Sequence, residues 1–479
     1  MTELALLVPL IALAGGALAC LGRTPAAADR LNVVAALVTA AAALTLAALA
    51  LTGEELRTRW LQVDGASGVL LAVIAVVGLC SALVSPAFLR TAGRSWFTAA
   101  RSRRAYYAAL YVFWAALMVV PVAGNLAVVW LVVEGTTGAS ALLVAFSGRR
   151  EALEAGWKYL VLTTLGLSVA LLGIVILAIG QAGLGETGLH ALDWTALERA
   201  ALEHDAALLA FVLIIAGLAT KIGLAPVHNW LPDAHSEAPA PISALLSAAL
   251  LPSVALVAWR VKTALEAAVG PGAAGAMFIG FGLASIIVAV PFLWRPLPFK
   301  RLLAYSSLEH MGVIALGIGF GTSLAIAGVL VHVAGHALAK SLGFYAALPL
   351  LRADPEAGSR PLAGVAASPT ATAITVSLIA LAGLPPSPLF VSEVLIALGG
   401  VQAGETAVVT VAVVALALGF LGLLHALFDG VLPEAGSRSR PHRGERQLVA
   451  LTWTLGTGLL ALTVAGALLP GSALVEALL

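Results

Sequence analysis

The chain is poor in charged residues and in cysteine. Only 11% of its 479 residues are Asp, Glu, Lys or Arg, and 61% are hydrophobic, whereas a soluble domain carries about 25% charged residues. Cys20 and Cys80 lie inside apolar runs, so neither a disulfide framework nor a CxxC metal site is expected. The net charge of +1 comes with no basic module, and no nucleic-acid partner is expected. The composition therefore excludes a series of soluble domains.

Long apolar runs fill the chain instead, and many reach the roughly 20 residues that a helix needs to cross a bilayer. They predict an all-α membrane protein, because backbone groups in lipid must be satisfied within a helix. The start of the chain lacks a basic segment, so we interpret it as a first helix rather than a signal peptide. We expect 14 spans, at about 3–21, 32–51, 66–89, 105–122, 124–146, 157–180, 206–231, 239–263, 272–294, 300–319, 322–350, 369–398, 406–428 and 448–469.

Basic residues gather in alternate loops. Eighteen Lys and Arg residues lie in the loops on one side of the predicted membrane, and five lie on the other side. Because cytoplasmic loops carry the excess of Lys and Arg, both termini are predicted on the outer side of a cell inner or plasma membrane. The other three of the 26 basic residues, Lys158, Lys221 and Lys340, fall within or at the edge of spans.

Two spans are interrupted by Gly and Pro, in GLAPVHNWLP and in AGLPPSPLF. Pro226 in the first, and Pro385 and Pro386 in the second, predict helix breaks that free carbonyls near Lys221 and before Glu393. Paired broken helices in inverted repeats indicate an ion path at mid-membrane. The single membrane domain, 1–479, is predicted to comprise three N-terminal helices (1–104), two inverted five-helix repeats (105–263 and 272–428) and a last helix (448–479).

Glu134 and Lys221 are charged residues inside predicted spans. A buried charge costs about 2.5 kcal/mol or more in a bilayer, so Glu134 must take a proton or find a cation. Burial disfavours a charged lysine and a nearby carboxylate favours it, so a Lys–Glu pair whose separation changes takes up and releases a proton. The structural alternatives are a fixed ion pair for Glu134 and, for Lys221, an ammonium held by freed carbonyls.

His332, His336 and Lys340 are spaced four residues apart and share one helix face. We interpret them, with His310 from the preceding span, as a proton relay; satisfied core histidines are the alternative. No metal is expected, because the glutamate of HExxH is missing. Glu393 is interpreted as the counterpart of Lys221 in the second repeat, and a structural pair between Glu393 and Lys340 is its alternative.

Further polar residues lie near the predicted inner surface. His228, Asp233 and His235 follow the first break, and histidine titrates near neutrality. They are candidates for proton access or support, and capping or loop geometry explains them equally well. Lys158 either joins them or extends to the membrane interface.

Several segments resemble a known superfamily. WLVVEGTTGASALLVAF, EALEAGWKYLVL, KIGLAPVHNWLPDAHSEAPAP, KRLLAYSSLEHMG, HVAGHALAKSLGFY and GLPPSPLFVSEVLI resemble the antiporter-like, proton-pumping subunits of respiratory complex I, Mrp sodium/proton antiporters and membrane-bound hydrogenases. The HxWLPDAHxxAP block is highly specific to it, and the matches run from about 124 to 398. WKYLVL, YSSLEHMG and APAPISALLS resemble most closely component F of the hydrogenase 4 group, which is related to formate hydrogenlyase.

The resemblance implies a proton-translocating subunit of a redox-driven complex. It implies that Glu134, Lys221, Lys340 and Glu393 are the ionisable residues of helices 5, 7, 11 and 12, and that the histidines 310, 332 and 336 lie on a central polar axis. No cofactor is expected in this chain, whose cysteines show no ligand pattern. The expected partners are other membrane subunits and a peripheral redox module, either nickel–iron hydrogenase-like or quinone-linked, with protons or sodium as the ion and lipid as the surroundings.

The chain departs from its complex I relatives in predicted helix 8. Pro252 stands where they carry a central lysine, and proline cannot replace that charge. Protons would then pass by water to the histidine row, or the subunit would pump poorly. The alternative functions are an Mrp-like cation/proton antiporter, the proton-conducting subunit of a bicarbonate-uptake complex and a scaffold that does not pump.

Overall fold

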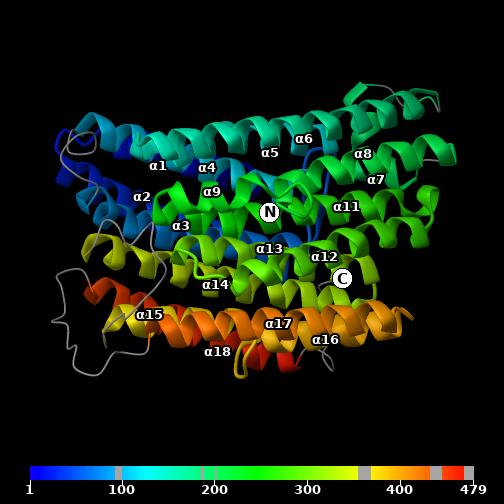
Figure 1. Cartoon of the computed structure of the whole chain (residues 1–479). Helices are drawn as coiled ribbons and strands as arrows, with labels where there is room; N and C mark the ends of the chain where they lie inside the picture. The colour runs from blue at the N-terminus through cyan, green and yellow to red at the C-terminus, as the bar shows by residue number, and fades with distance from the viewer. Residues whose placement is uncertain are drawn as a thin grey trace.

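The computed structural model describes residues 1–91, 100–183, 185, 188–199, 202–353, 368–431 and 445–468. Long helices lie side by side through this part of the chain, and the C-terminal helices α16–α18 form one edge of the view in Figure 1. The elements of the first half are α1 (Thr2–Cys20), α2 (Pro25–Leu51), β1 (Leu56–Arg57), β2 (Gln62–Val63), α3 (Gly65–Thr91), α4 (Ala100–Val119), η1 (Val120–Val122), α5 (Leu126–Val144), η2 (Ala145–Ser147), α6 (Arg150–Gly183), η3 (Gly188–Leu192), α7 (Trp194–Glu198), α8 (His204–Ile222) and α9 (Trp230–Glu237).

The second half places its most buried helices at the centre. In the apolar windows of 240–269 and of α13, 94% of the residues are buried, against 17% in α18. Polar side chains carried by these central helices are therefore shielded from lipid. The elements are α10 (Ala240–Leu245), the π-helical turn η4 (Leu246–Leu250), α11 (Leu251–Val269), α12 (Pro271–Leu293), α13 (Phe299–Phe320), α14 (Ser323–Ala353), α15 (Pro369–Leu381), α16 (Pro388–Gln402), α17 (Thr406–Val431) and α18 (Glu445–Leu468).

Thirteen helices among the described residues are long and apolar enough to cross a membrane, which confirms a helical, multi-pass membrane protein. The difference from the expected 14 lies in the twelfth span, because 369–398 contains two shorter helices, α15 and α16. Most of the predicted polar loop after α17 and residues 469–479 of the predicted last helix lie outside the described residues. The inverted repeat stays a prediction.

The first predicted break differs in detail from expectation. α8 ends at Ile222, and Gly223 adopts a left-handed conformation with φ of +79°, the usual way for glycine to end a helix. Pro226 therefore lies beyond the helix rather than inside it, and a separate short helix, α9, starts at Trp230. The break predicted at Pro226 is thus made by a glycine-terminated helix end three residues earlier.

The second break repeats this local geometry. Gly383 follows α15 with φ of +66°, and Gly-Leu-Pro-Pro at 383–386 matches Gly-Leu-Ala-Pro at 223–226. The N–H of Leu224 bonds to the Ala219 carbonyl, and the N–H of Leu384 bonds to the Ile379 carbonyl. Pro385 and Pro386 lie in this turn, and both turns contain a cis X–Pro bond. The two breaks thus share a sequence pattern and a hydrogen-bond pattern.

The departure at Pro252 coincides with an irregular helix. The π-helical turn η4 immediately precedes α11, and Pro252 lies in the first turn of α11. Proline cannot donate to the carbonyl four residues before it, so a change of hydrogen-bond register fits this position. π-turns inside helices are frequent at functional sites.

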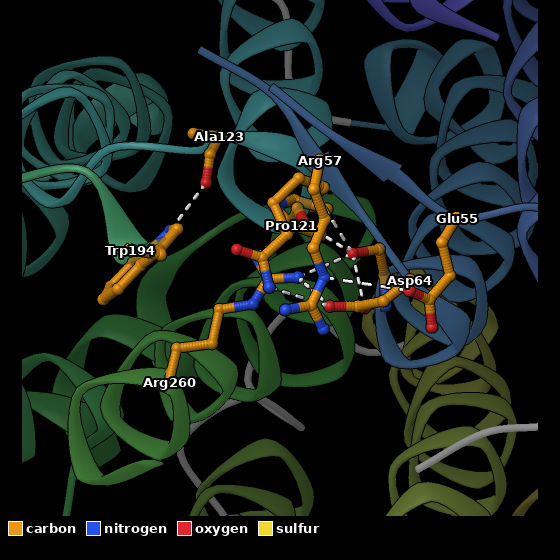
Figure 2. Close-up of polar contacts among 9 residues, drawn as sticks. Glu55, Arg57, Asp64, Pro121, Ala123, Trp194 and Arg260 are labelled. Atoms are coloured by element: carbon orange, nitrogen blue, oxygen red, sulfur yellow. Dashed lines mark hydrogen bonds and ion pairs between the residues drawn. The ribbon is translucent and has the colours of Figure 1, made fainter. Parts of the chain in front are cut away.

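Polar contacts tie the N-terminal helices to the first predicted repeat (Figure 2). The Arg260 guanidinium of α11 donates to the Asp64 carboxylate at 2.8 Å, the Ser67 hydroxyl at 2.7 Å and the Pro121 carbonyl at 2.9 Å. Within the first predicted repeat, the indole N–H of Trp194 donates to the carbonyl of Ala123. Burial would raise the pKa of Asp64, but Arg260 and the Ser67 hydrogen bonds outweigh it and hold this pKa below its usual value.

Candidate functional site

Lys221 is fully buried near the end of α8. Its ammonium donates to the Thr137 hydroxyl of α5 at 2.8 Å and to the Tyr159 hydroxyl of α6. The Tyr159 hydroxyl also lies 2.7 Å from the Ser140 hydroxyl. Hydroxyl groups, which can both accept and donate, therefore surround the ammonium, in place of the freed carbonyls that the sequence suggested as an alternative.

Glu134 lies on α5, one turn before Thr137. One carboxylate oxygen, Oε1, accepts a hydrogen bond of 2.8 Å from the Thr164 hydroxyl, and Oε2 finds no partner among the described residues. Its charge acts on both Lys221 and Tyr159. Glu134 thus influences Lys221 through its charge but does not form a hydrogen bond with it. The hydrogen-bond partners of the Lys221 ammonium are the two hydroxyl groups.

His235 lies deeper than the sequence suggested. Although it follows the first break, it is fully buried, and neither ring nitrogen has a hydrogen-bond partner among the described residues. Its ring lies in a row with Tyr159, Trp230 and Phe344, with successive centroid distances of 4.7, 6.4 and 5.6 Å. The charge of Lys340 also acts on it. His235 therefore lies between the surroundings of Lys221 and those of Lys340.

Lys340 is the buried lysine of the second predicted repeat. It lies on α14, fully buried, and its ammonium donates to the Leu303 carbonyl and to the Ser306 hydroxyl at 2.8 Å, both on α13. The charge of Lys340 acts on His310 and His336. The structure therefore brings Lys340 together with the predicted histidine row.

The three predicted axis histidines form one cluster. His310 Nδ1 lies 3.0 Å from His332 Nε2, and His332 Nδ1 lies 2.9 Å from the Ser392 hydroxyl of α16. His336 Nε2 lies 3.5 Å from the hydroxyl of Ser247, which is carried by the π-helical turn η4. All three rings are almost completely buried. The cluster links α13, α14, α16 and the irregular segment before Pro252.

Glu393 of α16 lies at the edge of this cluster. It is half-buried and lines a cavity of about 370 Å³ between α13, α16 and α17. A donor atom from each of His310, His332 and Glu393 lies within 4.8 Å of the others, a donor set of the kind that zinc accepts. Zinc bonds to nitrogen and oxygen are about 2.0–2.2 Å long, so donor atoms as far apart as 4.8 Å would have to move closer together to bind one ion. The expectation of no metal stays a prediction.

Of the remaining predicted residues, Lys158 and Asp233 share an ion-pair group near the start of α6, and His228 lies in the segment between α8 and α9. Asp233 pairs with Arg301 at 2.9 Å and with Lys158 at 3.4 Å, and Lys158 also pairs with Glu154. His228 is half-buried, and burial lowers its pKa more than a backbone hydrogen bond raises it. The contacts of Lys158 and Asp233 are those of a partly exposed ion-pair network.

A family model described as NADH:quinone oxidoreductase/Mrp antiporter, transmembrane, matches residues 123–419. The chain belongs to this antiporter family. It is 32% identical over 339 residues to a hydrogenase-4 component F homolog of Methylacidiphilum infernorum, covering 70% of this chain and 71% of the relative. It is 29% identical over 394 residues to NADH-quinone oxidoreductase subunit N of Desulforudis audaxviator, covering 79% and 74%.

The fold of the antiporter family extends over the whole chain. A solved chain of the Mrp complex from Dietzia sp. DQ12-45-1b superposes with a TM-score of 0.81 at 21% identity, covering 99% of this chain and 97% of the other. The comparisons confirm the predicted superfamily, with hydrogenase 4, complex I and Mrp relatives. These relatives are subunits or components of larger assemblies, which supports other membrane subunits as partners.

Several residues of the site were missed in the sequence, among them Tyr159, Ser247 and Glu309. Tyr159 stands beside Lys158 in WKYLVL, and Ser247 lies in APISALLS, both in segments that otherwise appear apolar. Glu309 of α13 immediately precedes His310 and is only 3% exposed. The signal for Glu309 was a carboxylate inside a predicted span, the same signal that identified Glu134.

Proposed function

We propose that this chain conducts protons across the membrane as one subunit of a redox-driven complex, either an energy-converting hydrogenase or a complex I-like assembly. The path runs from Glu134 and Lys221 past His235 to Lys340, the histidine cluster and Glu393. The observation that carries this proposal is the set of fully buried ionisable groups, Lys221, His235, Lys340 and the three clustered histidines, with the half-buried Glu134 beside Lys221 and the half-buried Glu393 beside the histidines.

The Glu134–Lys221 pair is the element that responds to a partner. Because Lys221 is held by hydroxyl groups on α5 and α6, a small shift of α5 or α8 changes its distance from Glu134 without opening the bundle. A closer carboxylate favours the protonated lysine and a more distant one favours its release. A proton released from Lys221 passes through water to His235 and then to the second half.

Electron transfer belongs to partner subunits in this proposal. The chain itself carries no cofactor, and a peripheral redox module, nickel–iron hydrogenase-like or quinone-linked, supplies the energy. Both termini lie on the outer side of the cell inner or plasma membrane, so the start of α6, where Lys158 pairs with Asp233 of α9, faces inward. Lys158, His228 and Asp233 then border the inner opening through which protons gain access.

The test uses sealed membrane vesicles that contain the native complex, with proton movement followed by a pH-sensitive dye while the partner reaction runs. Lys221→Ala and Glu134→Gln should each reduce proton movement by about tenfold or more. Co-purification of the partner subunits provides the control for assembly. Unchanged proton movement in both variants would reject the assigned path.

A second candidate is cation/proton antiport, which the likeness to a chain of an Mrp complex favours. The half-buried Glu393 carboxylate beside two imidazoles could bind a cation during exchange. This function predicts sodium-dependent proton flux in vesicles without any electron donor. A flux that requires the donor and ignores sodium would favour the redox-driven complex.

A further inference from the structure

Glu309 is a buried carboxylate that the path described above does not use. It lies on α13, 3% exposed, and its Oε1 atom finds no hydrogen-bond partner among the described residues. The side chain points at α17, because a Cβ atom added at Gly419 would lie 1.9 Å from Oε1. A buried ionised group without partners is costly, so this position needs either a proton or a neighbouring cation.

Lys340 is the nearby cation. The charge of Glu309 acts on Lys340 just as the charge of Glu134 acts on Lys221. In both cases the ammonium donates its hydrogen bonds to groups other than the glutamate. For Lys340 these groups are the Leu303 carbonyl and the Ser306 hydroxyl. The second half of the protein therefore has its own buried Glu–Lys pair.

The positions of the two glutamates in the fold agree with this pairing. Glu134 lies near the middle of α5, the second helix of the first predicted repeat, and Glu309 lies near the middle of α13, the second helix of the other. The two glutamates therefore occupy corresponding helices of the predicted repeat.

The Glu309 and Glu393 carboxylates are also close enough to repel each other electrostatically when both are charged. Two carboxylates that repel each other in a buried site tend to hold a proton between them. Glu393 lines the cavity of about 370 Å³, which is also lined by α13 and by α17, the helix that contacts Glu309. Glu309 is thus coupled to the buried lysine and to the acid at the cavity.

We propose that Glu309 carries protons between Lys340 and Glu393. The Lys340 ammonium gives a proton, through water, to the Glu309 carboxylate, which leaves a neutral amine and a carboxylic acid. The acid then passes that proton to the Glu393 carboxylate and regains its charge. This role rests on the proposed proton path, and it assigns to the second half a Glu–Lys exchange like that of Glu134 and Lys221.

The experiment compares Glu309→Gln, Glu309→Asp and Glu405→Gln in vesicles with the native complex. Glu309→Gln keeps the shape of the side chain, so partner co-purification should be normal, and proton movement should fall by about tenfold or more. Glu309→Asp should retain part of the proton movement, because it keeps an ionisable carboxyl group. A purely structural role of the Glu309 side chain would not predict this difference from Glu309→Gln. Glu405→Gln changes an acid in the loop before α17, outside the path, and should leave proton movement unchanged.

A second readout separates the two proposals. The infrared band of protonated carboxyl groups should lose intensity in Glu309→Gln and not in Glu405→Gln. Normal proton movement in Glu309→Gln, together with its loss in Lys221→Ala, would overturn the role of Glu309 and leave the path intact. Normal movement in both variants would overturn the path itself.

Discussion

At the scale of single residues, Lys221 and Lys340 are each buried among neutral hydrogen-bonding groups, with an acid in electrostatic reach. Neutral partners can hold either the ammonium or the amine, because a hydroxyl group both donates and accepts. A direct ion pair would stabilise the charged form alone. This arrangement suits a lysine that changes its protonation state.

The Tyr159 hydroxyl is the group that connects Lys221 with Ser140. We expect Tyr159→Phe to slow proton movement by about tenfold, because a hydrogen bond to a charged group contributes about 1.5–3 kcal/mol and a factor of ten corresponds to about 1.4 kcal/mol. The measurement is the initial rate of dye response in vesicles at equal amounts of assembled complex.

Tyr106 provides the matched control. It is also fully buried, and its hydroxyl lies 2.9 Å from the Ser85 hydroxyl of α3, whereas the hydroxyl of Tyr159 accepts from Lys221. Tyr106→Phe should therefore leave the rate unchanged. Equal losses in both variants would mean that the effect of Tyr159→Phe comes from general loosening of the bundle.

At the scale of helices, the sequence predicted the buried charges better than their surroundings. Glu134, Lys221 and Lys340 stood out because charge is rare in apolar runs, and the helices that carry them form. The end of α8 was placed too late, since Gly223 ends the helix before Pro226 can distort it. The π-helical turn and the burial of His235 depend on packing between distant segments, which one sequence does not encode locally.

The close packing of α6 against α8 positions Tyr159 relative to Lys221. A Cβ atom at Gly217 of α8 would lie 2.4 Å from the Gly166 carbonyl oxygen and 2.6 Å from the Ala170 nitrogen, both backbone atoms of α6. Gly217→Ala should force the helices apart, lower the free energy of unfolding by about 1–3 kcal/mol and reduce proton movement. Thermal unfolding of the purified protein and the vesicle assay measure the two effects.

Gly280 of α12 is the control for this change. It is also a helical glycine, but an added Cβ atom would meet no described atom within 4 Å. Gly280→Ala should therefore leave the unfolding temperature unchanged or raise it, because alanine favours a helix more than glycine does. A destabilisation as large as that of Gly217→Ala would show that the loss in Gly217→Ala does not come from the close contact between α6 and α8.

At the scale of the whole molecule, two groups of polar contacts join segments that lie far apart in the sequence. In one group, Arg149 before α6 pairs with Glu237 of α9 at 2.6 Å, and Asp233 of α9 pairs with Arg301 of α13. In the other group, Arg260 of α11 joins Asp64 before α3 and the Pro121 carbonyl after α4 (Figure 2). The most buried helices, α11 and α13, are thus tied to several other segments by polar contacts.

The Asp64–Arg260 contact should therefore contribute to global stability. Asp64→Asn leaves a buried guanidinium without its counter-charge, and we expect a loss of about 2 kcal/mol in the free energy of unfolding, below the roughly 3–5 kcal/mol of a fully buried pair because Asp64 retains some exposure. Glu55→Gln is the control, since Glu55 and Arg57 form an exposed pair at 3.7 Å whose contribution should be close to zero. Unfolding temperatures in lipid nanodiscs measure both changes.

The stabilising contribution of Asp64 depends on pH, and the direction of its pKa shift fixes where that contribution is lost. Because the pKa of Asp64 in the folded protein lies below the usual 3.8, its stabilising contribution is complete above the unfolded value and disappears as the pH falls through the folded value. The difference in unfolding temperature between the native protein and Asp64→Asn should stay constant from pH 8 to about pH 5 and shrink only below about pH 4. A difference that already shrinks between pH 7 and 5 would mean that burial outweighs Arg260 and raises the pKa of Asp64, so that the contact no longer acts as an ion pair near neutral pH.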